Sequence, residues 1–457
     1  MKDTIEGAPP IHPLLSAPVA PTLLKLAAPN LLGMLATTAV SIAETAYIGR
    51  LGAAPLAAAA LVLPLIMLMG MMSAGAMGGG VSSAVSRALG AGVQARAETL
   101  ARHGAVLGLG FGLFFTVLLS LFGELVFHGL GGRGETLRQA VLYAHIVFAF
   151  AAAIWLSNML ASILRGSGDM VGPSVAQLAG AALQVLLGGA LCFGWGPAPR
   201  LGIIGVGMGQ AISASLVTVI LFLLLRRRRS QVRLTLLGPL NRAHFLDILK
   251  VGGPAMLSPI QTVATILVIT AIAARFGTET LAGYGIGSRL EFLLVPIAFS
   301  VGVASLPMVG LAIGAGNVAR ARKVAWTAGG IAGAALGVLG FLLSLAPQLW
   351  VGIFTSDPGV GRAAATYLHF VGPVFAFFGL SLALYFSAQG AGRIAGPLLA
   401  GTLRLVVVAI GGVVLVRTDA PPWTLFALVA LGMITMGVMT AAFVALTPWG
   451  PKVLKAG

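Results

Sequence analysis

Stretches of about 20 consecutive apolar residues recur along this chain from Leu23 almost to the C-terminus. Each stretch is long enough to cross a hydrocarbon core about 30 Å thick as an α-helix. The strands of a membrane barrel would be about half as long and would alternate apolar with polar residues, and the sequence shows no such alternation. Only 9% of the residues are charged, against about 25% in soluble domains. The sequence therefore predicts an all-α integral membrane protein.

Twelve apolar segments meet this criterion, and an even number of crossings places both termini on the same side of the membrane. The predicted spans are 23–48, 54–80, 104–126, 140–163, 172–195, 202–225, 252–275, 281–307, 325–349, 367–387, 397–416 and 423–446.

The positions of the basic residues predict the orientation. With a cytoplasmic N-terminus, the inside segments contain 20 of the 28 Lys and Arg residues, Arg404 among them, and the outside segments contain seven, with Arg289 inside a span. This asymmetry is typical of the cytoplasmic side of membrane proteins, and it explains the net charge of +16 without a nucleic-acid partner. Residues 1–20 have no apolar core, so they are not a cleavable signal peptide, and we expect a multi-pass protein of the inner (plasma) membrane with cytoplasmic termini.

Motifs for enzymatic or nucleotide chemistry are missing from the sequence. Cys192 is the only cysteine, which excludes an intrachain disulfide and a cysteine-based metal cluster. There is no Gly-x-x-x-x-Gly-Lys-[Ser/Thr] stretch and no acidic cluster suited to Mg²⁺. We expect no cofactor, no metal and no required protein partner, and an integral membrane enzyme is a weak alternative.

An internal repeat sets the predicted architecture. At a nearly constant offset, just under half the length of the chain, proline, arginine, tyrosine, histidine and glycine positions match in the two halves: Pro29 with Pro254, Arg50 with Arg275, Gly52 with Gly277, Tyr143 with Tyr367, His145 with His369, and Gly90-Ala91-Gly92 with Gly314-Ala315-Gly316. Each half holds an even number of crossings, so the repeat is parallel. We predict two pseudo-symmetric six-helix lobes that enclose a cavity: residues 1–225 (spans one to six) and 251–457 (spans seven to twelve), joined by a basic cytoplasmic linker at 226–250.

Glu44 is the clearest candidate for chemistry within a span. An ionisable group near the bilayer centre costs at least about 2.5 to 3.5 kcal/mol, so it is a functional candidate by default. Glu44 shares one helix face with Thr37 and Ser41, since successive members of this set lie three or four residues apart. Because burial favours the protonated form of a carboxyl group, Glu44 is predicted to bind and release the coupling ion. The alternative is a hydrated carboxylate paired with Arg50 near the interface.

Other polar residues complete this prediction. Pro29 removes a helical hydrogen bond in the first span, so it permits a bend there. Asn158 in the fourth span and Gln177 and Gln184 in the fifth could form a network with Glu44 or could bond neighbouring helices. In the second half, Gln261, Thr262, Arg289 and Glu291 are possible polar contacts. Arg289 and Glu291 are two residues apart on a helix, so each must find its partner elsewhere.

Several segments resemble one transporter family. The segment Glu44-Thr-Ala-Tyr-Ile-Gly-Arg-Leu-Gly-Ala-Ala-Pro-Leu-Ala-Ala resembles the first span and outer turn of the multidrug and toxic compound extrusion (MATE) transporters. Gly287-Ser-Arg-Leu-Glu, Gly314-Ala-Gly and Gln389-Gly-Ala-Gly-Arg resemble motifs from the second half of that family. Because acids that some members carry in the seventh and tenth spans are missing, the pattern looks closer to the DinF-like branch.

The resemblance implies a transporter that exports amphipathic, often cationic, organic compounds in exchange for H⁺ or Na⁺. It also implies that Glu44 occupies the position of the first-span carboxylate, which is commonly Asp. Some members carry acids in the seventh and tenth spans, where this sequence has Gln261 and Thr262 and then no carboxylate between Tyr367 and Ser387. A cation site of that kind is therefore not expected in the C-lobe, and H⁺ is the preferred ion. The alternatives are Na⁺ coupling and a flippase of the wider superfamily for lipid-linked oligosaccharides. Such flippases commonly have fourteen spans and a cationic cavity.

Overall fold

The computed structural model describes residues 12–227, 231–235 and 237–450. Within these ranges the regular structure is helical throughout, in the order η1 (Pro13–Leu15), α1 (Val19–Gly49), α2 (Ala53–Gly70), the π-helical segment η2 (Met71–Met77), α3 (Gly78–Gly90), α4 (Gln94–Gly129), α5 (Gly134–Ala149), α6 (Ala151–Gly166), α7 (Val171–Phe193), α8 (Ile203–Arg226), α9 (Arg242–Ala255), α10 (Leu257–Arg275), α11 (Thr278–Gly314), α12 (Val318–Leu345), α13 (Gln348–Val351), α14 (Pro358–Val371), η3 (Gly372–Val374), α15 (Phe375–Gly390), α16 (Ala395–Arg417) and α17 (Trp423–Leu446).

The membrane-crossing segments agree with the prediction of twelve. In the described part of the chain, eleven helical segments are long and apolar enough to cross a bilayer, some of them composite, such as α2, η2 and α3 over Ala53–Gly90. The pair α5 and α6, bent by 44°, supplies the twelfth. The predicted span 140–163 is therefore a broken helix, interrupted at Phe150.

The repeat is visible in the backbone as well as in the sequence. The break at Phe150 recurs at the equivalent place in the second half, where η3 separates α14 from α15. The repeat-related glycines Gly52 and Gly277 have φ angles of 118° and 103° and precede α2 and α11. Only glycine adopts such angles without strain. The matching glycines therefore mark equivalent turns in the two halves.

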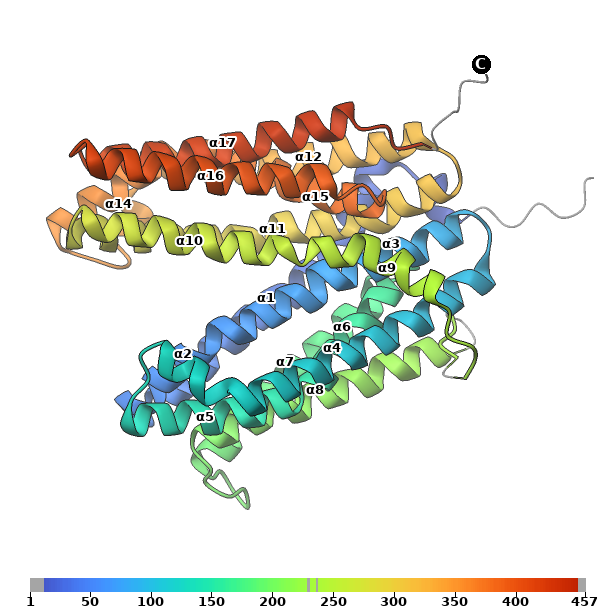
Figure 1. The fold of residues 1–457 in the computed structure, drawn as a ribbon, viewed down its shortest axis with the longest axis horizontal. Coiled ribbons are helices and arrows are strands. Elements are labelled where there is room, and N and C mark those ends of the chain that lie inside the picture. Colours follow the sequence, from blue (N-terminus) through green and yellow to red (C-terminus); the bar gives the residue numbers. More distant parts are fainter. Residues whose placement is uncertain (1–11, 228–230, 236, 451–457) are drawn as a thin grey trace, which may run out of the picture.

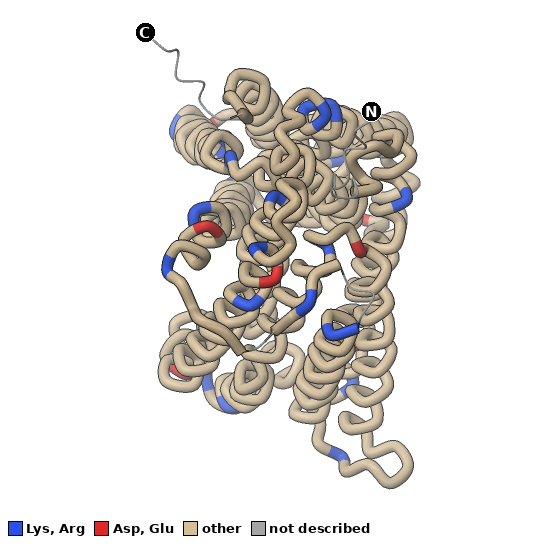
Figure 2. Tube along the Cα trace, turned by 90° about the vertical axis from the view of Figure 1, so that its right-hand side faces the viewer, with Lys and Arg blue, Asp and Glu red and all other residues tan. Residues whose placement is uncertain are grey.

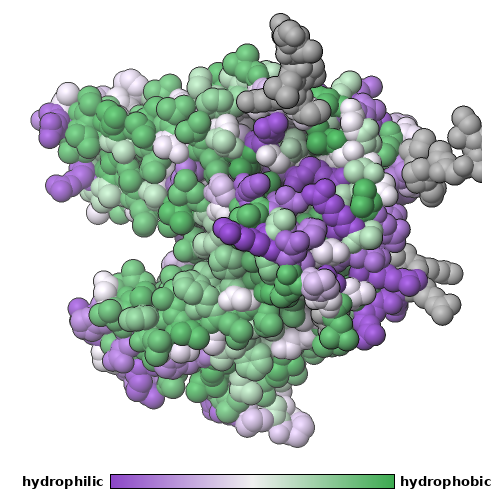
Figure 3. Space-filling view, turned by 45° about the vertical axis from the view of Figure 1, so that its right-hand side comes forward, coloured by the Kyte–Doolittle hydropathy of each residue, from purple (hydrophilic) through white to green (hydrophobic). Residues whose placement is uncertain are grey.

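The helices form two arms that diverge from one end of the molecule (Figure 1). One arm contains α2 and α4 to α8, the other contains α10 to α17, and α3 and α9 lie where the arms meet. In the space-filling view a hollow flanked mostly by hydrophobic surface separates the arms (Figure 3). The view onto the closed end shows mostly Lys and Arg among its charged residues (Figure 2).

Each arm has its own hydrophobic core, and α1 belongs to both. Ile48, near the end of α1, packs in the core of the first arm, whereas Val19 and Leu23, near its start, pack in the core of the second. On the outer surface, Leu121 and Leu125 of α4 are each 70% exposed, as expected of side chains that face lipid. The boundaries of the predicted lobes stay a prediction, and α9 already begins at Arg242, inside the proposed linker 226–250.

Candidate transport sites

Glu44 lies in the C-terminal half of α1, half-buried against α7. Its Oε1 atom accepts a hydrogen bond of 2.7 Å from Nε2 of Gln184, so two residues that the sequence singles out are in contact. The buried ring of Tyr143 on α5 is close enough to Glu44 to interact with it electrostatically. Among the described residues no ion pair joins Glu44 to Arg50 or to any other cation. The carboxyl group therefore has a neutral hydrogen-bonding partner.

The hydroxyl groups on α1 serve mainly the helix itself. Thr37 donates to the carbonyl oxygens of Gly33 and Met34, at 3.0 and 2.9 Å. Thr45 donates in the same way to the carbonyl of Ser41, at 2.8 Å. Bonds of this type satisfy a hydroxyl group without a tertiary partner. Ser41 shares the face of Glu44 but does not bond it.

Pro29 lies within α1, and Gln177 of α7 packs against α1 just beyond this proline. The helix is continuous from Val19 to Gly49 and passes through Pro29 without a break. Beyond the proline, Gly33 faces α7 so closely that a Cβ atom there would lie 2.9 Å from Oε1 of Gln177. Gln177 therefore lies against the part of α1 between Pro29 and Glu44. At the equivalent proline, Pro254, the helix does end, because α9 stops at Ala255.

Asn158 bonds a neighbouring segment and does not bond Glu44. Its Nδ2 atom donates a 2.8 Å hydrogen bond to Oγ of Ser73, which is fully buried in the π-helical segment η2. Segments of π-helix are rare and occur frequently at functional sites. Asn158 thus fixes η2 to α6.

The C-terminal arm contains a second carboxylate within a span. Glu291 on α11 accepts a hydrogen bond from the hydroxyl group of Tyr367 on α14. The guanidinium of Arg404 on α16 interacts with Glu291 electrostatically, although no ion pair joins them in the described ranges. Arg289 is exposed, and its guanidinium lies 5.2 Å from the ring centre of Phe354. Arg289 and Glu291 therefore have separate environments, as their spacing predicts.

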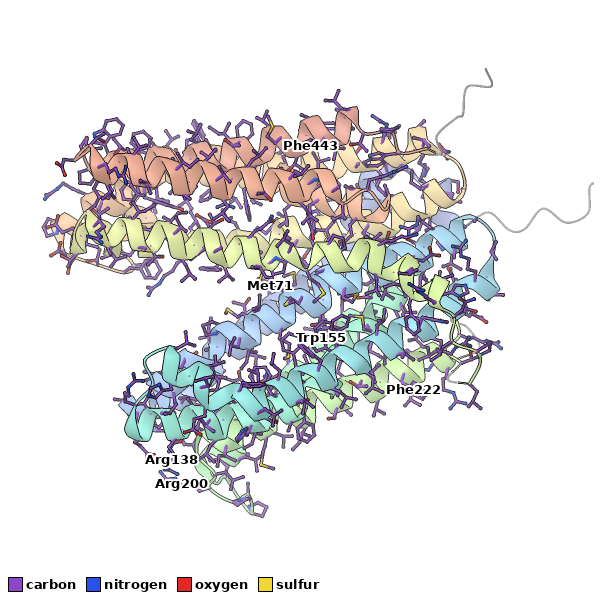
Figure 4. The ribbon with its side chains drawn as sticks, viewed as in Figure 1. Met71, Arg138, Trp155, Arg200, Phe222 and Phe443 are labelled. Carbon is purple, nitrogen blue, oxygen red and sulfur yellow. The ribbon has the colours of Figure 1, made fainter. Side chains whose placement is uncertain are left out.

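Gln261 and Thr262 line a cavity of about 170 Å³ in the same arm. Gln261 donates to Oγ1 of Thr402 at 2.7 Å, and Thr262 donates to the carbonyl of Ser258 at 3.0 Å. The cavity reaches η2 at Met71, which lies in the throat between the two arms (Figure 4).

The arms are sealed at the closed end by repeat-related contacts. A Cβ atom at Gly90 on α3 would collide with the carbonyl oxygen of Leu311 on α11, and one at Gly314 would collide with that of Arg87. The repeat relates Gly90 to Gly314, and it relates Arg87 to Leu311 in the same way. Ser83 adds a 2.6 Å hydrogen bond to the carbonyl oxygen of Gln389 on α15. Backbones this close leave no passage between α3 and α11.

Some of these residues could not be identified from the sequence. The pattern of basic residues assigns Arg404 to the inner side, but it is only 8% exposed in α16 and lines the cavity. The sequence identifies Tyr367 as a member of the repeat, but it does not show that Tyr367 bonds Glu291. Nothing in the sequence indicates Ser73 or the π-helical segment. In the described part of the chain no group of three or more His, Cys, Asp or Glu residues could hold a metal ion.

Comparison with known proteins gives consistent matches over most of the chain. The MatE family model matches residues 29–188 and 254–414, one segment in each half. A "Probable multidrug resistance protein NorM" of Deinococcus radiodurans is 31% identical over 400 residues, which cover 82% of this chain and 83% of that protein. An "FAD transporter" of Shewanella oneidensis is 26% identical over 316 residues, covering 68% of this chain and 69% of that protein.

Solved structures share the fold. A MOP superfamily transporter from Pyrococcus furiosus superposes with a TM-score of 0.88 at 23% identity, over 96% of this chain and 98% of the other. The outward-facing conformation of a multidrug resistance MATE family transporter gives a TM-score of 0.87 at 22% identity, with the same coverage. The relatives named here are transporters and not enzymes.

Proposed function

Because this chain belongs to the MatE family of membrane transporters, we propose that it exports amphipathic or cationic organic compounds in exchange for H⁺, by alternating access. The names of its relatives support export of small organic molecules, since one is a probable multidrug resistance protein. The described residues hold eleven spans, or twelve with the bent pair α5 and α6, which fits an exporter of this family better than a flippase with fourteen.

The environment of Glu44 is the observation that carries the proposal. The carboxyl group lies within a span, and its hydrogen-bond donor is the neutral amide of Gln184. A carboxylate buried without a cation is costly unless it takes up a proton or another cation. Binding of H⁺ would neutralise Glu44, and its release would restore the charge. Na⁺ would need several oxygen ligands besides the carboxylate, whereas the side chain that bonds Glu44 among the described residues is the amide nitrogen of Gln184.

The shape of the molecule supports alternating access. The arms diverge from an end that α3 and α11 seal, so the hollow opens to one side only (Figure 3). Helix α1 starts in the core of one arm and ends in the core of the other, with Pro29 between. A proline weakens the hydrogen-bond ladder of a helix, so α1 can bend there when Glu44 changes its charge.

The charges support an orientation with the sealed end in the cytoplasm. Lys and Arg predominate at this end (Figure 2), as they do on the cytoplasmic side of membrane proteins. The arms would then open to the outside. The protein would lie in the inner (plasma) membrane with its termini in the cytoplasm, without a cofactor other than the coupling ion.

Reconstituted liposomes test this function. We would follow ethidium transport by the purified protein under a pH gradient, and separately under a Na⁺ gradient at constant pH. We expect transport to require the pH gradient and to stop when an ionophore collapses it. Transport that follows the Na⁺ gradient alone would contradict H⁺ coupling, and the absence of transport of any organic cation under either gradient would contradict the function.

A further inference from the structure

The cavity in the C-terminal arm has a position suited to substrate. It is bounded by helices α10, α11, α15, α16 and α17 and is closed on the side of the first arm by Met71, Gly75 and Ala76 of η2. The wall is mostly apolar, and the aromatic rings of Phe299 and Phe386 meet edge to face at 4.8 Å. Such a wall accepts a flat apolar ring system.

Arg404 is the charged residue of this wall. Its side chain is only 8% exposed, and it extends along α17, where a Cβ atom at Gly432 would lie 3.5 Å from Cγ. The hydrogen bond that the structure gives its guanidinium runs from Nη1 to Sδ of Met436, at 3.8 Å. A thioether is a weak acceptor. Nε of Arg404 is buried without a partner among the described residues.

The neighbouring polar groups differ from Arg404 because they have protein partners. Gln261 bonds Thr402, and Ser381 bonds Thr440 at 2.9 Å. Buried donors are rarely left without an acceptor, and a buried guanidinium is the most costly of them. The unsatisfied Nε of Arg404, beside an Nη1 that has only a thioether as its acceptor, therefore indicates a missing acceptor in the cavity.

Glu291 does not fill that role in this conformation. It lies near enough for electrostatic attraction to Arg404, which reduces the cost of the buried charge. Its Oε1 atom, however, accepts from Tyr367, and no ion pair with Arg404 is formed in the described ranges. The guanidinium of Arg404 therefore has N–H capacity for an acceptor other than Glu291 and Met436. Two parallel N–H groups of an arginine match the two oxygens of a carboxylate.

We propose that Arg404 is the anion-binding group of a substrate site in the C-lobe, and that the site accepts amphipathic molecules that combine an aromatic ring with a carboxylate. This inference rests on the export function proposed above and extends its substrates from cations to organic anions. The same chemistry, an anionic group beside an apolar body, is also that of an acidic phospholipid, so the experiment separates the two sources.

Equilibrium binding tests the site without any gradient, so its result is independent of whether transport is observed. The probe is radiolabelled 1-naphthaleneacetate, and naphthylmethyl-trimethylammonium is its cationic counterpart. Arg404→Met keeps much of the length of the side chain and removes the charge. Arg404→Lys restores a charge, and Arg417→Met removes an exposed arginine from the end of the same helix.

We expect Arg404→Met to weaken binding of the naphthaleneacetate roughly 10- to 150-fold, since a hydrogen bond to a charged group contributes about 1.5–3 kcal/mol. The same change should strengthen binding of the cationic counterpart. Arg404→Lys should recover part of the affinity, and Arg417→Met should leave it unchanged. Equal anion affinity in wild type and in Arg404→Met, with both proteins monodisperse, would overturn the proposal.

A second experiment, with lipid, identifies the source of the anion. Native mass spectrometry of protein from phosphatidylglycerol liposomes would show whether one lipid stays bound to wild type and is lost in Arg404→Met. If it is, and if this lipid displaces the naphthaleneacetate, the anion site is supported with a lipid as its occupant. If Arg404→Met retains both the lipid and the naphthaleneacetate as wild type does, the proposal fails.

Discussion

The two halves of this transporter place their carboxylates at positions that the repeat does not relate. In the first half the carboxylate is Glu44 on α1, and the repeat-related position in the second half is Ile269. In the second half it is Glu291 on α11, and the repeat-related position in the first half is Ile66. Glu44 has a neutral amide as its donor, whereas Glu291 has a phenol and the field of a buried arginine.

Other parts of the repeat have stayed equivalent. The contact of Gly90 with Leu311 and that of Gly314 with Arg87 are related by the repeat, and the buried tyrosines of α5 and α14 are related in the same way. The two halves therefore share the backbone contacts that seal one end of the molecule, whereas the positions of their carboxylates within the spans differ. On the proposals above, the N-lobe exchanges the ion at Glu44, and the C-lobe binds the anionic group of a substrate at Arg404.

The largest effect should come from the carboxylate of the N-lobe. Glu44→Gln keeps a similar shape and the contact with Gln184 but cannot release a proton, so pH-driven ethidium transport should fall to the level of protein-free liposomes. Glu124→Gln, which changes an exposed carboxylate on α4, is the matched control and should transport as wild type does. Normal pH-driven transport by Glu44→Gln would contradict the proposal that the N-lobe carboxylate exchanges the proton.

A smaller effect should come from the close contacts between α3 and α11 that seal one end. A substitution in either lobe should change the distance between the arms equally. Gly90→Ala and Gly314→Ala each force α3 and α11 apart, because the new Cβ atom meets a backbone carbonyl. Overpacking costs about 1–3 kcal/mol, which would lower the population of the conformation seen here roughly 5- to 150-fold relative to other conformations.

Spin labels on cysteines introduced at Ala54 and Thr278, in a Cys192→Ser background, would report this change as a shorter distance between the open ends of the arms. Gly110→Ala is the control, because a Cβ atom at Gly110 meets nothing within 4 Å. A shift for one glycine and not for the other would show that the seal is not symmetric.

The smallest effect should come from the repeat-related tyrosines, and it should differ between them. Tyr367→Phe removes the donor to Glu291, which should lower the free energy of unfolding by about 1.5–3 kcal/mol. Tyr143 is near Glu44 without a hydrogen bond to it, so Tyr143→Phe should change stability by less than about 1 kcal/mol. Reversible unfolding in mixed micelles would measure both, and equal losses would mean that the two carboxylates are held alike.

The fold could be predicted from the sequence because its signals are strong and local. Apolar runs of membrane length predict the spans, and a repeat of prolines, arginines and glycines predicts the two halves. The break at Phe150 could not be predicted, since neither proline nor glycine marks it. The family resemblance directs attention to Glu44, and the polar face it shares with Thr37 suggests a wider network that the structure reduces to one direct partner.

The partners of buried groups depend on distances between helices, which one sequence does not contain. Gln184 and Asn158 are equal candidates in the sequence, but α7 brings Gln184 to Glu44, whereas α6 brings Asn158 to Ser73. The pattern of basic residues assigns Arg404 to the inner side, although it lies within the predicted span 397–416. Its burial beside a cavity follows from the packing of α16 against α10 and α17.

Proton release on substrate binding tests the division between the lobes most directly. Ethidium would be added to purified protein in weakly buffered detergent, with a pH-sensitive dye as the readout, for wild type, Glu44→Gln and Glu291→Gln. If Glu44 exchanges the ion, wild type and Glu291→Gln release about one proton per bound substrate, and Glu44→Gln binds substrate without release. Undiminished release from Glu44→Gln, or its loss in Glu291→Gln alone, would contradict the account.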